Sequence, residues 1–257
     1  MTQQIVLVTG ASQGIGRAIS ICLAQAGFDL ALNDLQHSAS LDNLCAEIEA
    51  MGRKTFKTLF DVSDLSAHTP ALVDIEEHLG PLTTLVNNAG VGVMRRGDPL
   101  EVQADSFDRC IAVNAKGPFF LTQAFAKRIL ARAERDRSAI YSVINITSSN
   151  ATAVSIPRAE YCASKAAAAM ISKCFAARLG QEGILVYDVQ PGLIATPMTA
   201  PMIDEYQARA ANGLCLLPRV GQPDEVGKVV ASLATHCLPY TTGQVISVDG
   251  GMLIPRF

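Results

Sequence analysis

The feature that most constrains the fold of this chain is a regular alternation of short apolar runs with longer amphipathic stretches. The first run, Ile5–Thr9, leads through glycines into a helical pattern over about Gly14–Ala26. Such alternation is typical of βαβ units, in which successive strands lie parallel. Because these crossovers are right-handed, the helices cover both faces of the sheet. We therefore expect an α/β protein with a mostly parallel sheet.

Seven segments are predicted strands: Ile5–Thr9, Phe28–Asn33, Thr55–Phe60, Thr84–Val86, Ala139–Ile146, Leu185–Val189 and Val245–Val248. Six segments have helical patterns: Gly14–Ala26, Leu41–Met51, Leu65–His78, Phe107–Arg132, Ala159–Leu179 and Asp224–Thr235. The longest irregular stretch is 191–218, which holds four prolines. Long loops in compact domains are often lids over functional sites. We expect one domain, 1–257, with a lid at about 191–218.

Composition excludes several classes of protein. Hydrophobic residues make up 49% of the 257 positions and charged residues 18%, which argues against disorder. A formal net charge of −3 gives no electrostatic basis for binding nucleic acid or an anionic membrane. No apolar run approaches the roughly 20 residues of a membrane-spanning helix.

The cysteines and histidines bear on compartment and metals. Seven cysteines without a Cys-x-x-Cys pair argue against a disulfide framework, and the four histidines lack metal-ligand spacing. The N-terminal residues show no features of a signal peptide. We therefore expect a cytoplasmic protein without a metal site.

A glycine-rich turn follows the first predicted strand. Gly10, Gly14 and Gly16 allow a tight bend and a close approach of phosphate, while the next helix offers free N–H donors at its N-terminus. A glycine cluster alone can also serve only the packing of a strand against a helix. The turn is therefore a candidate dinucleotide site that needs further support.

Asp34, which closes the second predicted strand, provides that support. Its carboxylate can accept hydrogen bonds from the ribose hydroxyls of NAD and would repel the 2′-phosphate of NADP. Neither Gln13 nor Leu35 supplies a cation for that phosphate. The alternative is that Asp34 is a solvated strand end or a helix cap. We expect NAD to be preferred over NADP.

Tyr161 and Lys165 stand one turn apart in the predicted helix Ala159–Leu179. A free tyrosine has a pKa of about 10, which is too high for efficient proton exchange at neutral pH. A nearby ammonium, together with the positive charge of an oxidised nicotinamide, would lower that pKa. Alone, the spacing usually marks two surface side chains.

In combination, these motifs resemble the short-chain dehydrogenase/reductase family over nearly the whole chain. The matching segments are Thr9–Gly16, Asp61-Val62, Asn87–Gly90, Asn114, Ser148, Tyr161–Lys165, Pro191-Gly192 with Thr196, Thr241–Gly243 and Asp249–Gly251. The chain is most similar to the branch of 3-oxoacyl-[acyl-carrier-protein] reductases and NAD-dependent sugar and polyol dehydrogenases. The resemblance implies a single-domain, doubly wound Rossmann fold with a seven-stranded sheet. Its cofactor half would span about 1–113 and its catalytic and substrate half about 114–257.

The resemblance also implies catalytic roles. Tyr161 would be the general acid/base, and Lys165 would tune it and hold the nicotinamide ribose. Ser148 would hydrogen-bond the substrate oxygen; Ser149 is the alternative, but Ser148 lies thirteen residues before Tyr161, the family's usual offset. Asn114 would support a water that connects Lys165 to bulk solvent.

Cofactor contacts are implied in the same way. Asp61 and Val62 would meet the adenine, Asn88 would line the adenosine side, and Ile194 with Thr196 would hold the nicotinamide carboxamide. The full set of implied cofactor positions is Gly10, Ser12, Gln13, Gly14, Ile15, Gly16, Asp34, Asp61, Val62, Asn88, Ala89, Gly90, Tyr161, Lys165, Pro191, Gly192, Ile194 and Thr196.

The sequence indicates the reaction better than the substrate. We expect interconversion of a secondary alcohol and a ketone by hydride transfer to or from NAD. The residues that would face the substrate lie in Val91–Gly97, Asn150–Arg158 and Leu193–Leu217. Asn150, Arg95, Arg96 and Arg158 are candidates there. The arginines would either meet an anionic group, such as a sugar acid or a phosphopantetheine arm, or be solvated, as loop arginines commonly are.

Two substrate classes and one other class of function stay open. A 3-oxoacyl thioester fits the branch, although those reductases more often use NADPH, which Asp34 disfavours. A sugar-derived or polyol alcohol fits an NAD-dependent oxidation. A non-catalytic dinucleotide sensor or scaffold is the alternative to an enzyme, and the presence of all four implied catalytic residues argues against it.

The helices also suggest self-association. Phe119–Ala133 and Ala166–Ala177 carry apolar and small residues over more than one face, which favours a symmetric dimer. The family resemblance implies a homodimer or homotetramer, with Met252–Pro255 at a second contact.

Overall fold

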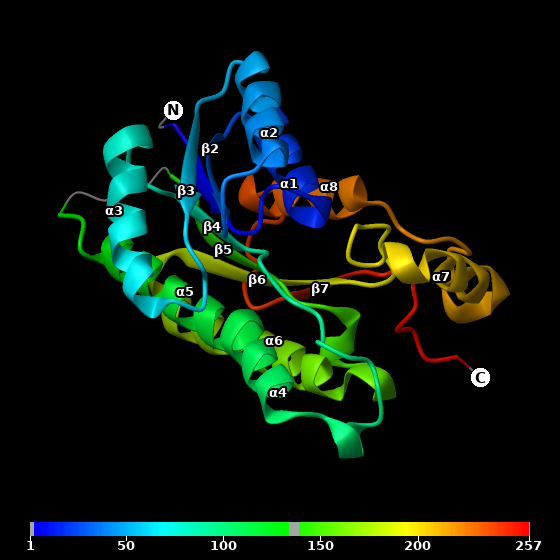
Figure 1. The fold of residues 1–257 in the computed structure, drawn as a ribbon. Coiled ribbons are helices and arrows are strands. Elements are labelled where there is room, and N and C mark those ends of the chain that lie inside the picture. Colours follow the sequence, from blue (N-terminus) through cyan, green and yellow to red (C-terminus); the bar gives the residue numbers. More distant parts are fainter. Residues whose placement is uncertain (1–2, 134–138, 257) are drawn as a thin grey trace.

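A seven-stranded parallel sheet forms the centre of the computed structural model, which describes residues 3–133 and 139–256 (Figure 1). The strand order is β3-β2-β1-β4-β5-β6-β7. The strands are β1 (Ile5–Val8), β2 (Asp29–Asp34), β3 (Thr55–Leu59), β4 (Thr84–Asn87), β5 (Tyr141–Ile146), β6 (Ile184–Pro191) and β7 (Val245–Val248). The order reverses direction between β1 and β4, and ligands of such sheets bind at that switch point.

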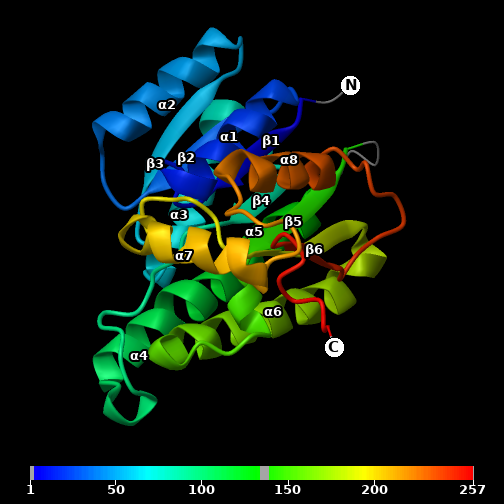
Figure 2. The same ribbon diagram turned by 90° about the vertical axis from the view of Figure 1, so that its right-hand side faces the viewer.

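Helices cover both faces of this sheet (Figures 1 and 2). One layer consists of α1 (Gly14–Gln25), α2 (Ala39–Ala50) and α8 (Pro223–Ala234). The other includes α3 (His68–Leu79), α5 (Gly117–Leu130) and α6 (Ala159–Leu179). The predicted α/β class and the seven-stranded sheet are confirmed, and every pairing between neighbouring strands is parallel.

Alternating side chains of the central strands enter two separate cores. In β1, Val6 and Val8 belong to the core under α1, α2 and α8, whereas Ile5 and Leu7 belong to the core under α3, α5 and α6. A strand buried on both faces must be apolar throughout, which explains the continuous apolar runs of the sequence. The two cores fix the sheet, and thereby the edge at which all the strands end.

The single helix predicted over Phe107–Arg132 is wrong. The structure has α4 (Ala104–Ile111), a π-helical turn over Ala112–Lys116 and then α5. Pro118 has no N–H to donate to the carbonyl of Asn114, so regular α-helical bonding cannot continue there. Gly117 packs so closely that a Cβ on it would lie 2.4 Å from the Val62 carbonyl oxygen. Single π-turns inside helices occur frequently at functional sites.

The stretch 191–218 is more ordered than predicted. It contains α7 (Ile203–Arg209), preceded by a 3₁₀ turn at Ala200–Met202. Figure 1 shows α7 beyond the helical layers, near the ends of β6 and β7. An ion pair between Glu205 and Arg209, 3.6 Å apart and four residues apart in sequence, supports this helix. Within the described ranges, no helix has both the length and the apolar character needed to cross a bilayer.

Candidate active site

A cavity of about 1000 Å³ opens where the parallel strands end. Much of its wall comes from segments at the ends of strands: the glycine turn after β1, Asp34 at the end of β2, 60–62 after β3, 88–91 after β4, 146–150 at and after the end of β5, and 191–199 at and after the end of β6. Parallel strands bring their carboxyl ends to one edge, so segments far apart in sequence meet around one space.

The glycine turn is built by steric necessity. Gly10 and Gly14 have φ values of +63° and +54°, a region that side chains with a Cβ rarely adopt. A Cβ on Gly16 would lie 2.1 Å from the Gly10 carbonyl oxygen. Only glycine therefore lets α1 begin directly behind the turn.

The N-terminus of α1 is open toward the cavity. Among the described residues, no side chain caps it, and its first turn holds no acidic residue. The start of α8, by contrast, is closed by a capping box between Gln222 and Glu225. Uncapped N–H groups at a helix start attract phosphate, so this cradle fits the pyrophosphate of a dinucleotide.

Asp34 lies at the cavity wall beside the glycine turn. Its Oδ2 accepts a hydrogen bond from the Ser12 backbone N–H at 3.3 Å, and its Oδ1 accepts one from the Leu35 N–H at 2.8 Å. Ser12 itself is buried behind the wall and does not line the cavity. The carboxylate is thus fixed by backbone donors at the position predicted to meet a ribose.

Asn88 holds the glycine turn in place through hydrogen bonds to its backbone. Its Nδ2 donates to the carbonyls of Thr9 and Gly10 at 2.9 and 3.0 Å, while the Thr9 hydroxyl accepts from the N–H groups of Asn88 and Ala89. Ala89 and Gly90 continue the wall. This network ties the end of β4 to the end of β1.

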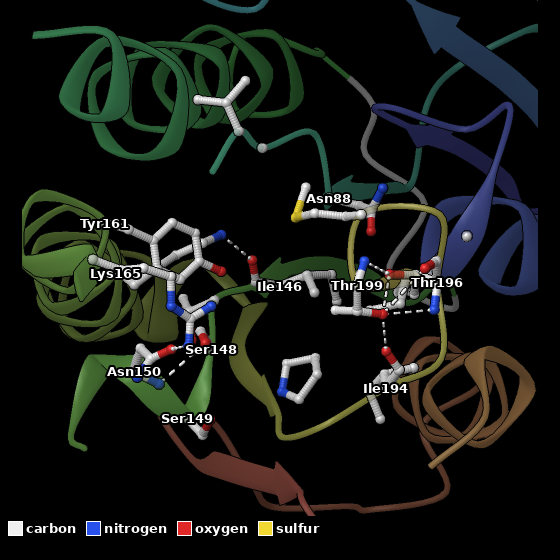
Figure 3. A pocket seen from close by; sticks show the side chains of 18 of the residues that line it. Asn88, Ile146, Ser148, Ser149, Asn150, Tyr161, Lys165, Ile194, Thr196 and Thr199 are labelled. Atoms are coloured by element: carbon white, nitrogen blue, oxygen red, sulfur yellow. Dashed lines mark hydrogen bonds between the residues drawn. The ribbon is translucent and has the colours of Figure 1, made fainter. Parts of the chain in front are cut away.

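Further predicted cofactor positions complete the wall: Gln13, Ile15, Asp61, Val62, Pro191, Gly192, Ile194 and Thr196. A Cβ on Gly14 would lie 3.5 Å from Thr196 Cβ, so the segment after β6 faces the glycine turn across a narrow gap. The Thr199 hydroxyl donates to the Ile194 carbonyl at 2.6 Å and accepts from the Thr196 N–H at 2.9 Å (Figure 3). These bonds fix the course of the chain as it leaves β6.

Ser148 and Tyr161 meet at the opposite end of the cavity (Figure 3). Ser148 follows β5, and Tyr161 lies in the first turn of α6. The Ser148 side chain lowers the pKa of the neighbouring Tyr161 hydroxyl, and its Oγ accepts a hydrogen bond from the Asn150 N–H at 3.0 Å. Ser149 also lines the cavity, but its side chain lies farther from the tyrosine in Figure 3. The geometry therefore pairs Ser148, rather than Ser149, with Tyr161.

The pKa of Tyr161 differs from the expectation in one respect. Burial raises it above its ordinary value, and this effect exceeds the lowering by Ser148 and by the charge of Arg158. The guanidinium carbon of Arg158 lies 5.5 Å from the centre of the phenol ring. Arg158 is thus a cation that lowers the pKa of the phenol in the protein alone. The lowering by Lys165 together with an oxidised nicotinamide stays a prediction.

Lys165 is held beneath the tyrosine. Its Nζ donates to the Ile146 carbonyl at 3.0 Å and lies 5.8 Å from the centre of the Tyr161 ring. Burial lowers the pKa of Lys165 to about 8, and the carboxylate of Asp188 opposes that shift. Both effects on the pKa of Lys165 therefore come from its buried surroundings.

Asn114 lies in the π-turn and behind the cavity wall. Its Nδ2 donates to the Val91 carbonyl and to the Ser164 hydroxyl, both at 3.0 Å, and its Oδ1 accepts from the Val91 N–H at 2.8 Å. The side chain thus joins the segment after β4 to α6. A Cβ on Gly90 would lie 3.1 Å from Asn114 Oδ1 and 3.5 Å from Lys165 Nζ, so the two polar groups approach the same point.

The substrate-loop candidates divide into two groups. Asn150, Arg96 and Arg158 line the cavity, whereas Arg95 does not. Arg158 donates to Asn150 Oδ1 at 2.9 Å, and Arg96 donates to the Tyr206 hydroxyl of α7 at 3.3 Å. The prediction that Arg95 faces the substrate is therefore not supported by its position.

Sequence reasoning missed two residues that line this site and one buried behind it. Arg109 of α4 lines the cavity and donates to the Gly92 carbonyl at 3.3 Å. Tyr206 lies in the stretch predicted to be irregular; the Glu205–Arg209 spacing was the available signal for a helix. Asp188 is buried in β6 beside Thr147 and Gln190. An acid inside an apolar strand would have been a signal for a buried polar partner.

The strand order and the cavity at the carboxyl edge define a protein of the doubly wound Rossmann class. A family model described as "Enoyl-(Acyl carrier protein) reductase" matches residues 10–253. The chain is 34% identical to a short-chain dehydrogenase/reductase of Armillaria gallica, over 97% of this chain and 96% of the relative. It therefore belongs to the short-chain dehydrogenase/reductase family, whose members are oxidoreductases acting on CH–OH and C=O groups. The predicted family is confirmed.

Two solved structures show the range of similar proteins. A 3-oxoacyl-[acyl-carrier protein] reductase from Brucella melitensis in complex with NAD is 35% identical, with a TM-score of 0.95 over 100% of both chains. A provisionally assigned 2-deoxy-d-gluconate 3-dehydrogenase from Agrobacterium tumefaciens, with bound NADP, is 31% identical, with a TM-score of 0.85 over 98% of this chain and 97% of that one.

Proposed function

We propose that this chain interconverts a secondary alcohol and a ketone with a nicotinamide dinucleotide, and that Tyr161 is the general acid/base. The observation that carries this proposal is the convergence of Ser148 and Tyr161 at one end of a cavity whose other end is the glycine turn. When bound, the dinucleotide supplies or accepts the hydride. The side chains position the substrate and move its proton.

The proton step would use the pair as follows. Ser148 would hydrogen-bond the substrate oxygen and hold it next to the Tyr161 hydroxyl. In the oxidation direction, Tyr161 as phenolate would take the hydroxyl proton while the carbon loses its hydride; in reduction it would donate that proton. The high pKa of the buried phenol suits proton donation. The charge of Arg158, and that of an oxidised cofactor, would favour the phenolate needed for oxidation.

Lys165 and Asn114 would support the same proton step. The Lys165 ammonium would hold the nicotinamide ribose beside the phenol. The Asn114 side chain is occupied by Val91 and Ser164. Its backbone carbonyl lacks the N–H that position 118 would give it in a regular helix, because position 118 is proline. We propose that this carbonyl binds the water that links Lys165 to solvent.

NAD is the cofactor that the cavity favours. Asp34 is held by two backbone N–H groups, and the neighbouring wall residues Gln13 and Leu35 carry no positive charge. A 2′-phosphate there would face a carboxylate without a compensating cation. The relatives with known ligands include one with NAD and one with NADP, so this preference depends on Asp34.

The assembly and the compartment are also proposals. Exposed apolar side chains occur at Phe107, Phe120 and Met170 on α4, α5 and α6, which favours a dimer or tetramer built on these helices. All seven cysteines lie in the described ranges and are unpaired there, which suits a reducing compartment such as the cytoplasm. We also treat the whole chain as one functional domain, since strands from both halves share one sheet.

The direct test measures the oxidation of a panel of polyols, aldoses, hydroxy acids and 3-hydroxyacyl thioesters through the formation of NADH. The same panel is measured with NADP in place of NAD. We expect oxidation of at least one class with NAD and weaker activity with NADP. Dinucleotide binding without turnover of any class, in either direction, would instead favour a non-catalytic sensor.

A further inference from the structure

Three arginines that line the cavity lack the carboxylate partner that most of the described arginines have. Arg17, Arg53, Arg128, Arg132, Arg178, Arg209 and Arg219 each lie within 4 Å of a carboxylate oxygen. No described carboxylate forms such a pair with Arg96, Arg109 or Arg158, and all three line the cavity. Glu205, the one carboxylate of α7 at this wall, is paired with Arg209.

Arg158 is the arginine most firmly placed for a ligand. It is half-buried, and its Nε and Nη2 donate to Ser155 Oγ at 3.3 Å and Asn150 Oδ1 at 2.9 Å. The amide of Asn150 is itself oriented, because its Nδ2 donates to the Ala153 carbonyl at 2.9 Å. Within the described part of the chain, its Nη1 has no hydrogen-bond partner. A guanidinium has five donors, so donors remain for a ligand.

We propose that Arg158 binds a carboxylate of the substrate, so that the enzyme acts on a short hydroxy acid and its oxo acid. This inference rests on the proposed function. The Arg158 guanidinium carbon lies 5.5 Å from the centre of the Tyr161 ring, so an anion on Arg158 lies only a few bonds from a carbon whose hydroxyl meets Tyr161. A planar guanidinium fork matches a carboxylate, and Arg96 and Arg109 add positive charge to the same cavity.

The distance favours a carboxylate on the substrate itself over the phosphate of a phosphopantetheine arm. Such a phosphate lies many bonds from the reacting carbon, whereas Arg158 stands beside the tyrosine. Arg158 also favours the phenolate of Tyr161, and that effect would be the same for charged and uncharged substrates. A matched pair of substrates therefore separates the two roles.

The test compares each hydroxy acid with its own amide. Gluconate and 3-hydroxybutanoate, with gluconamide and 3-hydroxybutanamide, are measured for kcat/KM with NAD, and for Kd on the NADH-loaded protein by calorimetry. We expect at least one acid to be favoured over its amide by about 10- to 100-fold in the wild type. Arg158→Gln should bring the acid-to-amide ratio close to one. Arg158→Lys should keep the pH dependence of kcat/KM that reports on Tyr161 but retain only part of the acid-to-amide ratio.

Arg178→Gln, which removes a positive charge at the far end of α6, is the matched control and should keep the acid-to-amide ratio. Wild-type protein that binds and oxidises no acid better than its amide would overturn the proposal, as would an unchanged ratio in folded Arg158→Gln, with folding checked by thermal unfolding.

Two more arms separate the remaining outcomes. An Arg158-dependent preference for a 3-oxobutanoyl thioester of pantetheine 4′-phosphate over that of pantetheine, without discrimination between acid and amide, would place the anion on a carrier arm and overturn the carboxylate. Turnover of neutral polyols with no preference for acids would overturn the anion site but leave the proposed reaction standing. No turnover of any compound would contradict the proposed function itself.

Discussion

The two ends of the cavity are built by different means and carry opposite charge. The cofactor end, formed by the glycine turn, Asp34 and Asp61, is largely backbone, and its only charged wall residues in the described chain are carboxylates. The catalytic end, formed around Ser148 and Tyr161, consists of long side chains and is rich in arginine. One end thus selects by the shape of the backbone, and the other by side chains that several segments bring together.

This contrast separates recognition of a cofactor from recognition of a substrate. A glycine turn ahead of an uncapped helix can bind any pyrophosphate, and in the proposed function Asp34 then discriminates between the two dinucleotides. The arginines of the catalytic end come from the β4–α4 loop, from α4 and from the start of α6, so their arrangement depends on how these separate segments pack together. The predictions below test each end in turn.

Tyr161→Phe should have the largest effect. Removing the hydroxyl removes the proton donor and acceptor, so kcat should fall by about 10²- to 10⁴-fold. Affinity for NADH, measured by fluorescence titration, should change little, because the ring, Lys165 and the whole cofactor end remain. Tyr240→Phe, at a fully exposed position, is the control. Near-normal turnover in Tyr161→Phe would break the assignment of chemistry to the catalytic end.

Asp34→Ala should change the cofactor end alone. Loss of the carboxylate should shift the ratio of kcat/KM for NAD over NADP toward NADP by about 10- to 100-fold, since like charges brought together cost several kcal/mol. Asp64→Ala removes a carboxylate away from the cavity wall and should leave the ratio unchanged. If NADP is already preferred by the wild type, the charge contrast between the ends does not govern cofactor choice.

Lys165→Met should reveal the energetic cost of the buried cation. The folded-state pKa of about 8 lies below the ordinary 10.5, so the unfolded chain binds more protons between these values and wild-type stability rises with pH there. The free energy of unfolding of the variant relative to wild type should fall by up to roughly 3 kcal/mol between pH 7 and pH 10.5. Denaturant unfolding at the two pH values measures this; a difference independent of pH would contradict it.

Tyr206→Phe should have the smallest effect. It removes the hydrogen bond from Arg96 that ties α7 to the loop after β4. At 3.3 Å this bond should contribute about 0.5–1.5 kcal/mol at most, so KM for the substrate should rise by about two- to tenfold with kcat nearly unchanged. A large loss of kcat would mean that α7 belongs to the catalytic machinery rather than to substrate binding.

The sequence by itself determined the parts of this protein that depend on local rules. The apolar runs predicted seven strands, and the glycines predicted the turn, because only glycine tolerates the φ of Gly10 and Gly14 and the contact at Gly16. The spacing of Tyr161 and Lys165 placed both on one helix. These features can be predicted because each depends on a few neighbouring residues.

Only the tertiary structure decided what depends on packing between distant segments. It divided the helix over Phe107–Arg132 at a π-turn, placed Arg109 but not Arg95 at the cavity, and brought the Arg158 guanidinium close to the phenol of Tyr161. Burial and the direction of a long side chain are set by residues far away in the chain, as for Arg96 and Tyr206, which lie 110 positions apart. No local sequence pattern contains that information. It arises only when the folded sheet brings the ends of its strands together at one edge.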